Sequence, residues 1–250
     1  MTPIGAAQHV LNGNLFKQKY IIKHKLFCED ALEEAVLVRC TDKSRTYQSG
    51  LALLFGFLPK LDISKIDIQM ATNASMCTSD TGHECGCLAS DPFMDVMSAT
   101  YKQTSARVRK NVKAERVYST LQKMFDCSAA QLPRPSHILD VTMVHFCHGE
   151  NLPGYNGECM PNWVAKDVYD ILRENGAHQI KESDFVKISR LKMQPVLFEV
   201  ADRMIKQGSR DTPLKFVLYS GYDSTTDPLS VALNFSSGLW SPYATRIVFE

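Results

Sequence analysis

The order of apolar and polar runs in residues 35–70 constrains the fold more than any other feature of the chain. Residues 35–39 form a short apolar run, and a polar stretch separates them from a Leu-rich segment at 49–57 that Pro59 ends. Apolar and polar residues then alternate over 66–70. These patterns predict a buried strand, a helix and a second strand. That succession predicts an α/β fold.

The α/β pattern is interrupted in the middle of the chain and resumes near its end. The middle contains several apolar stripes at helical spacing, and no strand is obvious there. Examples are Val112, Val117, Leu121 and Phe125, and then Val164, Val168 and Leu172. Residues 214–220 then predict a buried strand, 227–235 a helix and 245–250 a last strand. We therefore expect a mixed sheet flanked by helices, interrupted by a mostly helical insertion. The expected domains are an α/β body of residues 1–75 and 206–250 and a helical cap of residues 76–205.

The first residues predict a helix that packs on the core. Thr2 suits the N-cap position, and Pro3 suits the first helical position. Apolar side chains then recur along one stripe, which predicts that this stripe is buried. The stripe consists of Ile4, Ala7, Leu11, Leu15 and Ile22.

Charge and hydropathy exclude two classes of partner. The 28 basic and 27 acidic residues nearly cancel, so no overall field would hold the chain on nucleic acid or on an anionic membrane. With 250 residues and 44% hydrophobic content, the chain can bury a sizeable core. Its longest apolar run, residues 51–58, is shorter than a membrane-spanning helix needs. Because Met1 leads straight into the predicted helix, we expect no targeting segment in the chain.

The eight cysteines predict disulfides. An even count fits paired thiols in an oxidising compartment. Zinc is the alternative, because His83 lies close to Cys85 and Cys87, and histidines also flank Cys147. The spacing favours disulfides, since structural zinc sites usually separate their cysteines by more than the single residue found here. We expect no metal, and the pairs expected from closeness in sequence are Cys147 with Cys159, and Cys77 with Cys85 or Cys87.

Two glycosylation sequons agree with this interpretation. Asn73 and Asn234 each begin an Asn-x-Ser triplet. Together with the cysteines they predict a disulfide-bonded glycoprotein of the secretory pathway.

Two predicted strand-to-helix junctions are rich in groups that bind phosphate. In the first, Arg45 is flanked by Ser44, Thr46 and Ser49. In the second, Asp223 lies beside a glycine and three hydroxyl side chains. Ligands of α/β sheets bind at the carboxyl ends of strands, where an arginine and the free N–H groups of a helix can meet one anion. Each group also has a structural interpretation, as a helix cap or a surface ion pair, and position alone leaves both open.

Three segments resemble the histidine acid phosphatases. Residues 43–59 are similar to the second phosphate-arginine segment of that family. Residues 218–223, with 240–250 downstream, resemble its His-Asp segment and the strand that follows. The start of the chain, from Thr2 to Gly13, looks like the helix after the family's first loop. The segments occur in the family's order and span nearly the whole chain.

The resemblance implies a two-step phosphatase reaction. In the family a histidine takes the phosphoryl group, arginines hold its oxygens, and an aspartic acid protonates the leaving oxygen. By matched position, Arg45 is the phosphate holder and Asp223 the acid. Tyr222 stands where the family has the histidine of its His-Asp pair, so the resemblance makes it the second phosphate-binding residue. A phenol can donate one hydrogen bond to the phosphate but brings no positive charge. No cofactor is implied.

The finer resemblance implies a substrate. Residues 8–13, 23–26, 50–54 and 145–148 look most like members that act on 2-phosphoxylose in the glycosaminoglycan linkage region of proteoglycans. That resemblance implies a phosphomonoesterase of the Golgi lumen or secretory pathway whose partner is this phosphorylated sugar.

One motif of the family is missing. No Arg-His-Gly run, which would supply the attacking histidine, occurs in the sequence. We expect that loop and the first strand of the sheet to lie outside the chain, which looks cut at both ends, and we expect the chain itself to be inactive. Two alternatives stay open: a pseudophosphatase or carbohydrate-binding remnant, and a generic acid phosphatase.

Overall fold

The computed structural model describes two compact units, which are treated separately. The described residues are 1–27, 32–70, 96, 99, 102–103, 106–108, 110–208 and 213–250. The α/β unit comprises Met1–Asp91, Ser189–Asn234 and Ser241–Glu250, and the helical unit comprises Pro92–Ile188 and Phe235–Trp240. The cap boundaries at 76 and 205 stay a prediction.

The elements of the α/β unit follow the succession predicted from the sequence. Its N-terminal elements are α1 (Pro3–Phe16), the π-helix η1 (Lys17–Lys23), α2 (Leu32–Ala35), β1 (Val36–Cys40), α3 (Ser44–Phe57), the short helix η3 (Ile63–Lys65) and β2 (Asp67–Met70). Its C-terminal elements are α9 (Ser183–Gly208), whose first residues belong to the helical unit, β5 (Phe216–Ser220) and α10 (Asp223–Ala232).

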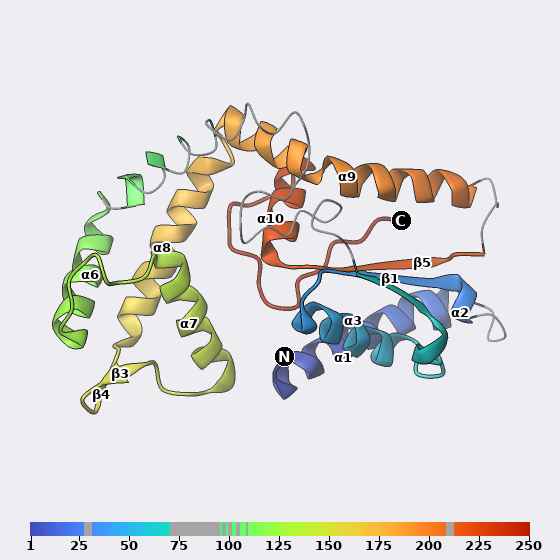
Figure 1. Cartoon of the computed structure of the whole chain (residues 1–250), viewed down its shortest axis with the longest axis horizontal. Helices are drawn as coiled ribbons and strands as arrows, with labels where there is room; N and C mark the ends of the chain where they lie inside the picture. Colours follow the sequence, from blue (N-terminus) through green and yellow to red (C-terminus); the bar gives the residue numbers. More distant parts are fainter. Residues whose placement is uncertain are drawn as a thin grey trace. The chain divides into compact units, whose positions relative to one another are not determined.

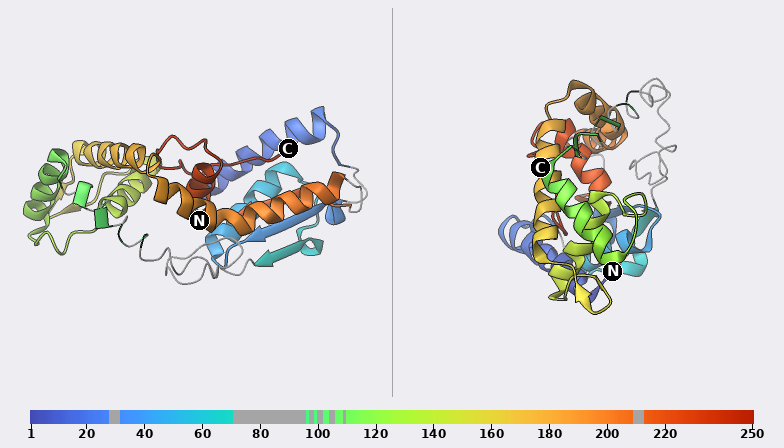
Figure 2. Two further views of the ribbon diagram at one scale, coloured as in Figure 1. Left: turned by 90° about the horizontal axis from the view of Figure 1, so that it is seen from above. Right: turned by 90° about the vertical axis from the view of Figure 1, so that its left-hand side faces the viewer.

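The strands of the α/β unit form one parallel sheet in the order β2-β1-β5 (Figure 1). The last residue of β1, Cys40, is paired with Met70 of β2 on one side and with Ser220 of β5 on the other. Helices α1 and α3 cover one face of this sheet, and α9 covers the other (Figure 1 and Figure 2). A parallel sheet with helices on both faces confirms the predicted α/β fold.

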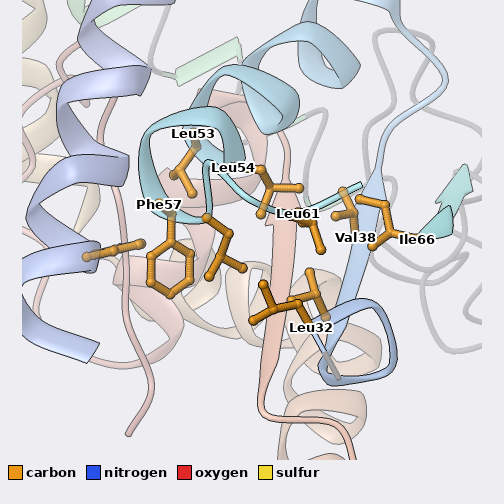
Figure 3. Close-up of a cluster of buried hydrophobic side chains, with 10 residues drawn as sticks. Leu32, Val38, Leu53, Leu54, Phe57, Leu61 and Ile66 are labelled. Atoms are coloured by element: carbon orange, nitrogen blue, oxygen red, sulfur yellow. The ribbon is translucent and has the colours of Figure 1, made fainter. Parts of the chain in front are cut away.

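Side chains from β1, α1 and α3 form the core on one face of the sheet (Figure 3). Val38 of β1 packs with Leu54 and Phe57 of α3, and all three are at most 2% exposed. The centre of the Phe57 ring lies 4.8 Å from that of Phe216 in β5 and 5.9 Å from that of Phe16 in α1. Since burying one such ring contributes about 1.5 to 3 kcal/mol, Phe57 ties α3 to both α1 and the sheet.

Two glycines let α1 and α3 approach until their backbones touch. A Cβ atom on Gly13 would lie 2.1 Å from the carbonyl oxygen of Leu53, and one on Gly56 would lie 2.1 Å from that of Val10. Neither backbone oxygen can move away without distorting its helix. The glycines therefore set the distance between the two helices and fix the position of α3 over the sheet.

We expect Gly13→Ala to destabilise the protein by about 2 kcal/mol or more, because the new methyl group overlaps a helix backbone. Gly5→Ala in the same helix is the matched control, since a Cβ there meets nothing closer than Thr2 Oγ1 at 3.4 Å. The control should keep its stability or gain up to about 1 kcal/mol. Urea unfolding followed by circular dichroism measures both variants, and equal stabilities would contradict the close helix crossing.

The predicted N-terminal helix is present, but its apolar stripe is not buried. Thr2 caps α1 and Pro3 is its first residue. The buried residues of α1 are Asn12, Gly13 and Phe16, because Gly13 has to face α3. The prediction of a core-packed stripe is therefore wrong: its large side chains are exposed, namely Ile4 (43%), Leu11 (61%), Leu15 (48%) and Ile22 (55%).

The strand predicted at residues 245–250 does not form. A strand needs a neighbouring backbone to pair with, and side chains of the N-terminal helix bind this segment instead. Asn12 donates a hydrogen bond to the carbonyl oxygen of Ala244 (2.8 Å) and accepts one from Arg246. Glu250 accepts further hydrogen bonds from side chains of η1. The C-terminal segment is therefore held to the helix by polar contacts.

One carboxylate links β1 and β5 to α9. Glu199 accepts hydrogen bonds from Arg39 of β1 and from Tyr219 of β5, the latter at 3.0 Å. Arg203, one turn further along α9, donates a third at 2.9 Å. Burial disfavours the charge of Glu199, but these hydrogen bonds outweigh it and lower its pKa. Burial and the Glu199 charge together raise the pKa of Tyr219 to about 12, so that the phenol stays a donor.

Glu199→Gln should lower the free energy of unfolding by about 2 to 3 kcal/mol at neutral pH, because it removes a carboxylate that pairs with two partly buried arginines. A lowered pKa means that the carboxylate stabilises the fold above its usual pKa of 4.5 and loses this contribution as the pH falls below it. The variant should therefore lose less stability than the wild type on acidification.

Asp202→Asn on the same helix is the control, since it breaks only an exposed ion pair with Lys206 and should cost less than about 1 kcal/mol. Chemical unfolding at a series of pH values measures all three proteins. If acidification lowers the free energy of unfolding equally in Glu199→Gln and in the wild type, the carboxylate does not have this role.

Among its described residues, the helical unit consists of helices and one short antiparallel strand pair: α6 (Val112–Phe125), α7 (Pro135–His148), β3 (Gly154–Tyr155), β4 (Glu158–Cys159) and α8 (Asn162–Gln179). The apolar stripes predicted here form its core, since Val117, Leu121, Val164 and Val168 are at most 1% exposed. Val112 is an exception at 81% exposed, because it is the first residue of α6. No helix in the described ranges combines the length and the apolar character needed to cross a membrane.

Candidate functional site

The carboxyl ends of β1 and β5 meet at one edge of the sheet, and a helix begins just after each. Cys40 ends β1 and faces Ser220, which ends β5. Helix α3 begins at Ser44 and α10 begins at Asp223. Because the strands are parallel, both helices present their N-terminal ends at this edge. Both begin earlier than the predicted positions 49 and 227, so Arg45 and Asp223 lie in first helical turns.

Buried hydroxyl groups fix the two junctions to each other. The Ser220 hydroxyl donates to the carbonyl oxygen of Thr46 at 2.7 Å, and the Thr41 N–H donates to the carbonyl oxygen of Ser220 at 3.3 Å. The hydroxyl oxygens of Thr41 and Thr46 lie 2.7 Å apart. A Cβ atom on Gly50 of α3 would lie only 3.4 Å from the Ser220 Cβ. The first turns of α3 are therefore held directly against the end of β5.

Arg45 and Tyr222, the two residues predicted to bind phosphate, are in direct contact. The guanidinium carbon of Arg45 lies 4.4 Å from the centre of the Tyr222 ring, which is a cation–π geometry. Arg45 is exposed and Tyr222 is half-buried. The ring supports one face of the guanidinium, whose N–H donors lie in its own plane and point away from that face. The sequence alone did not indicate this contact, because the two residues are far apart along the chain.

Asp223, the predicted acid, is the first residue of α10 and follows Tyr222 directly. Its Oδ1 accepts a hydrogen bond from the backbone N–H of Ser224 at 2.8 Å. The carboxylate is exposed and lies at the helix end where a negative charge is stabilised. Asp223 is therefore the first residue of α10 and not its N-cap, which is Tyr222, and its carboxylate binds one backbone N–H of the first turn.

The arrangement at this edge can bind an anion. The first N–H groups of a helix have no partner within the helix, and their partial positive charge attracts anions. In α10 the N–H groups of Ser224, Thr225 and Thr226 already have acceptors. This helix therefore offers the N–H of Asp223 itself, and α3 offers those of Ser44 and Arg45, next to the charged side chain of Arg45. A guanidinium and two helix N-termini suit a group with several negative oxygens. The Asp223 carboxyl next to them can exchange a proton with the bound group.

Asp227, a second carboxylate on α10, was not predicted as a site residue. Burial raises its pKa, and the charge of Asp223 one turn earlier adds to the effect. A hydrogen bond from the Ser241 hydroxyl to Asp227 Oδ1 opposes the increase. The Thr226 hydroxyl lies 3.3 Å from that of Ser241. The sequence contained one signal that Asp223 and Asp227 are neighbours. They are four residues apart, and side chains at that spacing lie next to each other on a helix.

We expect Asp227→Asn to make stability less dependent on pH. A carboxyl whose pKa is raised by folding contributes stability that is complete below its usual pKa of 3.8 and is lost as the pH rises through the raised pKa. Asparagine keeps an acceptor for Ser241 and removes the charge. The variant should therefore lose less stability than the wild type between acidic and neutral pH.

Ser241→Ala is a control with the opposite expected effect. It removes the hydrogen bond that favours the carboxylate, so it should increase the stability lost between acidic and neutral pH. Thermal unfolding midpoints across the pH range compare the three proteins. Parallel curves for the wild type and Asp227→Asn would rule out a desolvated charge at this position.

The disulfide predicted between Cys147 and Cys159 is wrong for this structure. Both residues are exposed free thiols, Cys147 near the end of α7 and Cys159 in the strand pair β3–β4. Closeness in sequence does not bring two thiols into bonding geometry when separate elements hold them apart. Cys77, Cys85 and Cys87 lie outside the described residues.

The remaining predictions concern two glycosylation sequons and the expected absence of a metal site. Asn234 is exposed just after α10, with a left-handed backbone (φ 61°), and its glycosylation stays a prediction. Asn73 lies outside the described residues. Within the described ranges, no three His, Cys, Asp or Glu side chains are grouped so that they could hold a metal ion. Nδ1 of His145 lies 3.2 Å from a carboxylate oxygen of Glu150.

Comparisons with known proteins agree with the resemblance seen in the sequence. The model of the histidine phosphatase superfamily (branch 2) matches residues 1–250. The 2-phosphoxylose phosphatase 1 of Mus musculus is 31% identical over 252 residues, and that of Rattus norvegicus is 32% identical over 254 residues. Each alignment covers 100% of this chain and 50% of the relative.

Similarity extends more weakly to another phosphatase. The prostatic acid phosphatase of Homo sapiens is 22% identical over 276 residues, an alignment that covers 100% of this chain and 65% of the relative. The chain spans about half the length of the 2-phosphoxylose phosphatases that it matches.

Proposed function

The chain belongs to the histidine phosphatase superfamily (branch 2), and on that basis we propose that its site binds a phosphate monoester for hydrolysis. The observation that supports this most directly is the Arg45–Tyr222 contact, which lies where the N-termini of α3 and α10 meet. A phosphate monoester carries a charge of about −1.5 to −2 near neutral pH. It therefore needs a cation and several N–H donors, and this edge of the sheet has both.

In this proposal Arg45 holds the phosphate oxygens and Asp223 protonates the leaving oxygen. The planar guanidinium can donate two parallel hydrogen bonds to phosphate. A sugar alkoxide leaves poorly unless it is protonated, so a general acid is required.

We propose 2-phosphoxylose of the proteoglycan linkage region as the phosphorylated sugar. The support is the identity of 30% to 32%, over all of this chain, with mammalian proteins named 2-phosphoxylose phosphatase 1. A location in the Golgi lumen or elsewhere in the secretory pathway is part of the same proposal. A generic acid phosphatase is the alternative, with the weaker support of the 22% identity to prostatic acid phosphatase.

We further propose that these 250 residues bind the monoester without hydrolysing it by themselves. They contain no Arg-His-Gly run, which in the family supplies the attacking histidine. Tyr222 stands in the place of the family's other histidine and cannot add a positive charge. A binding protein without turnover, a pseudophosphatase, is therefore the second candidate function. Phosphate release from an aryl phosphate by this chain alone would contradict the absence of turnover.

Isothermal titration with three ligands tests the proposed site: methyl 2-phosphoxyloside, the same xyloside without phosphate, and inorganic phosphate. We expect the phosphorylated xyloside to bind at least about tenfold more tightly than the unphosphorylated one. Arg45→Gln should weaken its binding by about 10- to 100-fold, since a charge-assisted hydrogen bond contributes about 1.5 to 3 kcal/mol.

Arg173→Gln is the matched control, because it removes an exposed arginine of the helical unit. It should bind like the wild type. If Arg45→Gln also binds like the wild type, the phosphate is not held at this edge of the sheet.

Tyr222→His tests the residue at the position of the family's histidine. Imidazole gains a positive charge below about pH 6.5, so the variant should bind inorganic phosphate more tightly than the wild type in acid and equally in alkali. Tyr222→Phe keeps the ring beside Arg45 and should bind about as the wild type does at each pH. A Tyr222→His variant with the same affinity as the wild type at every pH would place this side chain out of reach of the phosphate.

A further inference from the structure

Helix α9 contains a half-buried lysine, Lys192, in addition to the charged residues of the candidate site. It lies on the buried face of the helix, beside Ser189, Met193 and Val196, which are at most 4% exposed. Burial lowers the pKa of its ammonium group, because the charge loses hydration there. No described residue forms an ion pair or a hydrogen bond with this group. A buried charge without a partner costs free energy, and a ligand of opposite charge would offset that cost.

Two contacts show that α9 runs antiparallel to β5 (both are labelled in Figure 1). The amide group of Gln207, near the end of α9, lies beside the carbonyl oxygen of Leu214 and the ammonium group of Lys215, just before β5 begins. Glu199, about two turns earlier in the helix, accepts a hydrogen bond from Tyr219 near the end of the strand. Moving backwards along α9 therefore leads forwards along β5, towards the edge at which α3 and α10 begin.

Lys192 lies two further turns towards that edge. It precedes Glu199 by seven residues, which is about 10 Å along a helix and the length of about three residues in a strand. Since Glu199 is level with Tyr219, Lys192 is level with Tyr222. Seven residues are close to two full turns, so the side chains of Lys192 and Glu199 leave the helix on the same side, towards the sheet.

Packing against α10 supports this position independently. Pro195 lies inside α9 between Lys192 and Glu199, and a proline removes a backbone hydrogen bond and bends a helix. The turn before the proline is nevertheless fixed, because Met193 is fully buried in one cluster with Leu229 of α10. Lys192 is the neighbour of Met193 in the chain, so it lies where α9 passes the start of α10.

The charge of a phosphate monoester, about −1.5 to −2 near neutral pH, calls for more than one cation. Arg45 brings one positive charge and Tyr222 brings none. Lys43 at the start of α3 is exposed and lies 3.9 Å from a carboxylate oxygen of Asp42, which already offsets its charge.

Given the proposed phosphate function, on which this inference rests, we propose that Lys192 is a second phosphate-binding cation of the site. Its flexible four-carbon stem carries the ammonium group towards the sheet edge from the face covered by α9, whereas Arg45 approaches from the face covered by α3 (Figure 1 and Figure 2). A partly desolvated ammonium group attracts an anion more strongly than an exposed one does.

Isothermal titration of the 250-residue chain with inorganic phosphate tests this role. Lys192→Met should weaken phosphate binding by about tenfold or more, because it removes a charge-assisted hydrogen bond. It should also raise the thermal unfolding midpoint, because an apolar side chain costs less to bury than an ammonium group. Lys192→Arg keeps the positive charge and should bind phosphate within about threefold of the wild type. If Lys192→Met does not fold, Lys192→Gln replaces it and should show the same loss of affinity.

Lys206→Met is the matched control on the same helix. Lys206 is exposed and precedes Gln207, at the opposite end of β5 from the site, so the phosphate affinity of this variant should equal that of the wild type. Equal losses of affinity in Lys192→Met and Lys192→Arg, with a lower unfolding midpoint in both, would overturn the inference in favour of a structural role.

The same titrations separate this inference from the proposed function. If Arg45→Gln weakens phosphate binding and Lys192→Met does not, the inference about Lys192 is wrong and the proposed function stands. If the wild type itself does not bind phosphate, both are wrong.

Discussion

The in-register pairing of β1 with β5 is the contact on which the candidate site depends. It places Cys40 beside Ser220, so that the helices that follow the two strands begin at the same edge of the sheet. Hydrogen bonds hold this register on both faces, from the Ser220 hydroxyl to α3 on one and from Tyr219 to Glu199 of α9 on the other. A shift by one residue would turn every side chain of the strand to the opposite face and would break both contacts. The Arg45–Tyr222 contact exists because this register is fixed.

Packing on one face of the sheet sets the position of the arginine. The backbones of α1 and α3 touch at Gly13 and Gly56, and Phe57 joins α3 to α1 and to β5. Since a helix is a stiff element, fixing its middle and its C-terminal end also fixes the first turn that contains Arg45. The Tyr222 ring then restricts the guanidinium itself. In the proposed phosphate site, an arginine that is already held in place loses less conformational entropy when it binds an anion.

The sequence predicted β1, β2 and β5 of the parallel sheet and the positions of Arg45 and Asp223 after two of these strands, because buried strands and helix-start chemistry are local signals. It also predicted a strand at 245–250 that does not form. The predicted helix starts were too late. In α3, hydrogen bonds of the backbone and of side chains such as Thr46 close the first turn before the apolar periodicity begins. The stripe on α1 was misassigned because periodicity counts apolar residues, whereas this helix packs through Gly13. The Arg45–Tyr222 contact, the raised pKa of Asp227 and the free thiols of Cys147 and Cys159 depend on distances between elements, which a single sequence does not contain.

We propose that two helix N-termini and Arg45 bind one phosphate together. NMR titration of the chain with inorganic phosphate, followed at the backbone amides of Ser44, Arg45 and Asp223, tests this. Signals from both helix starts should shift with one common dissociation constant, because α3 and α10 meet at the same edge. Shifts confined to one of the two helix starts, or two different dissociation constants, would contradict it.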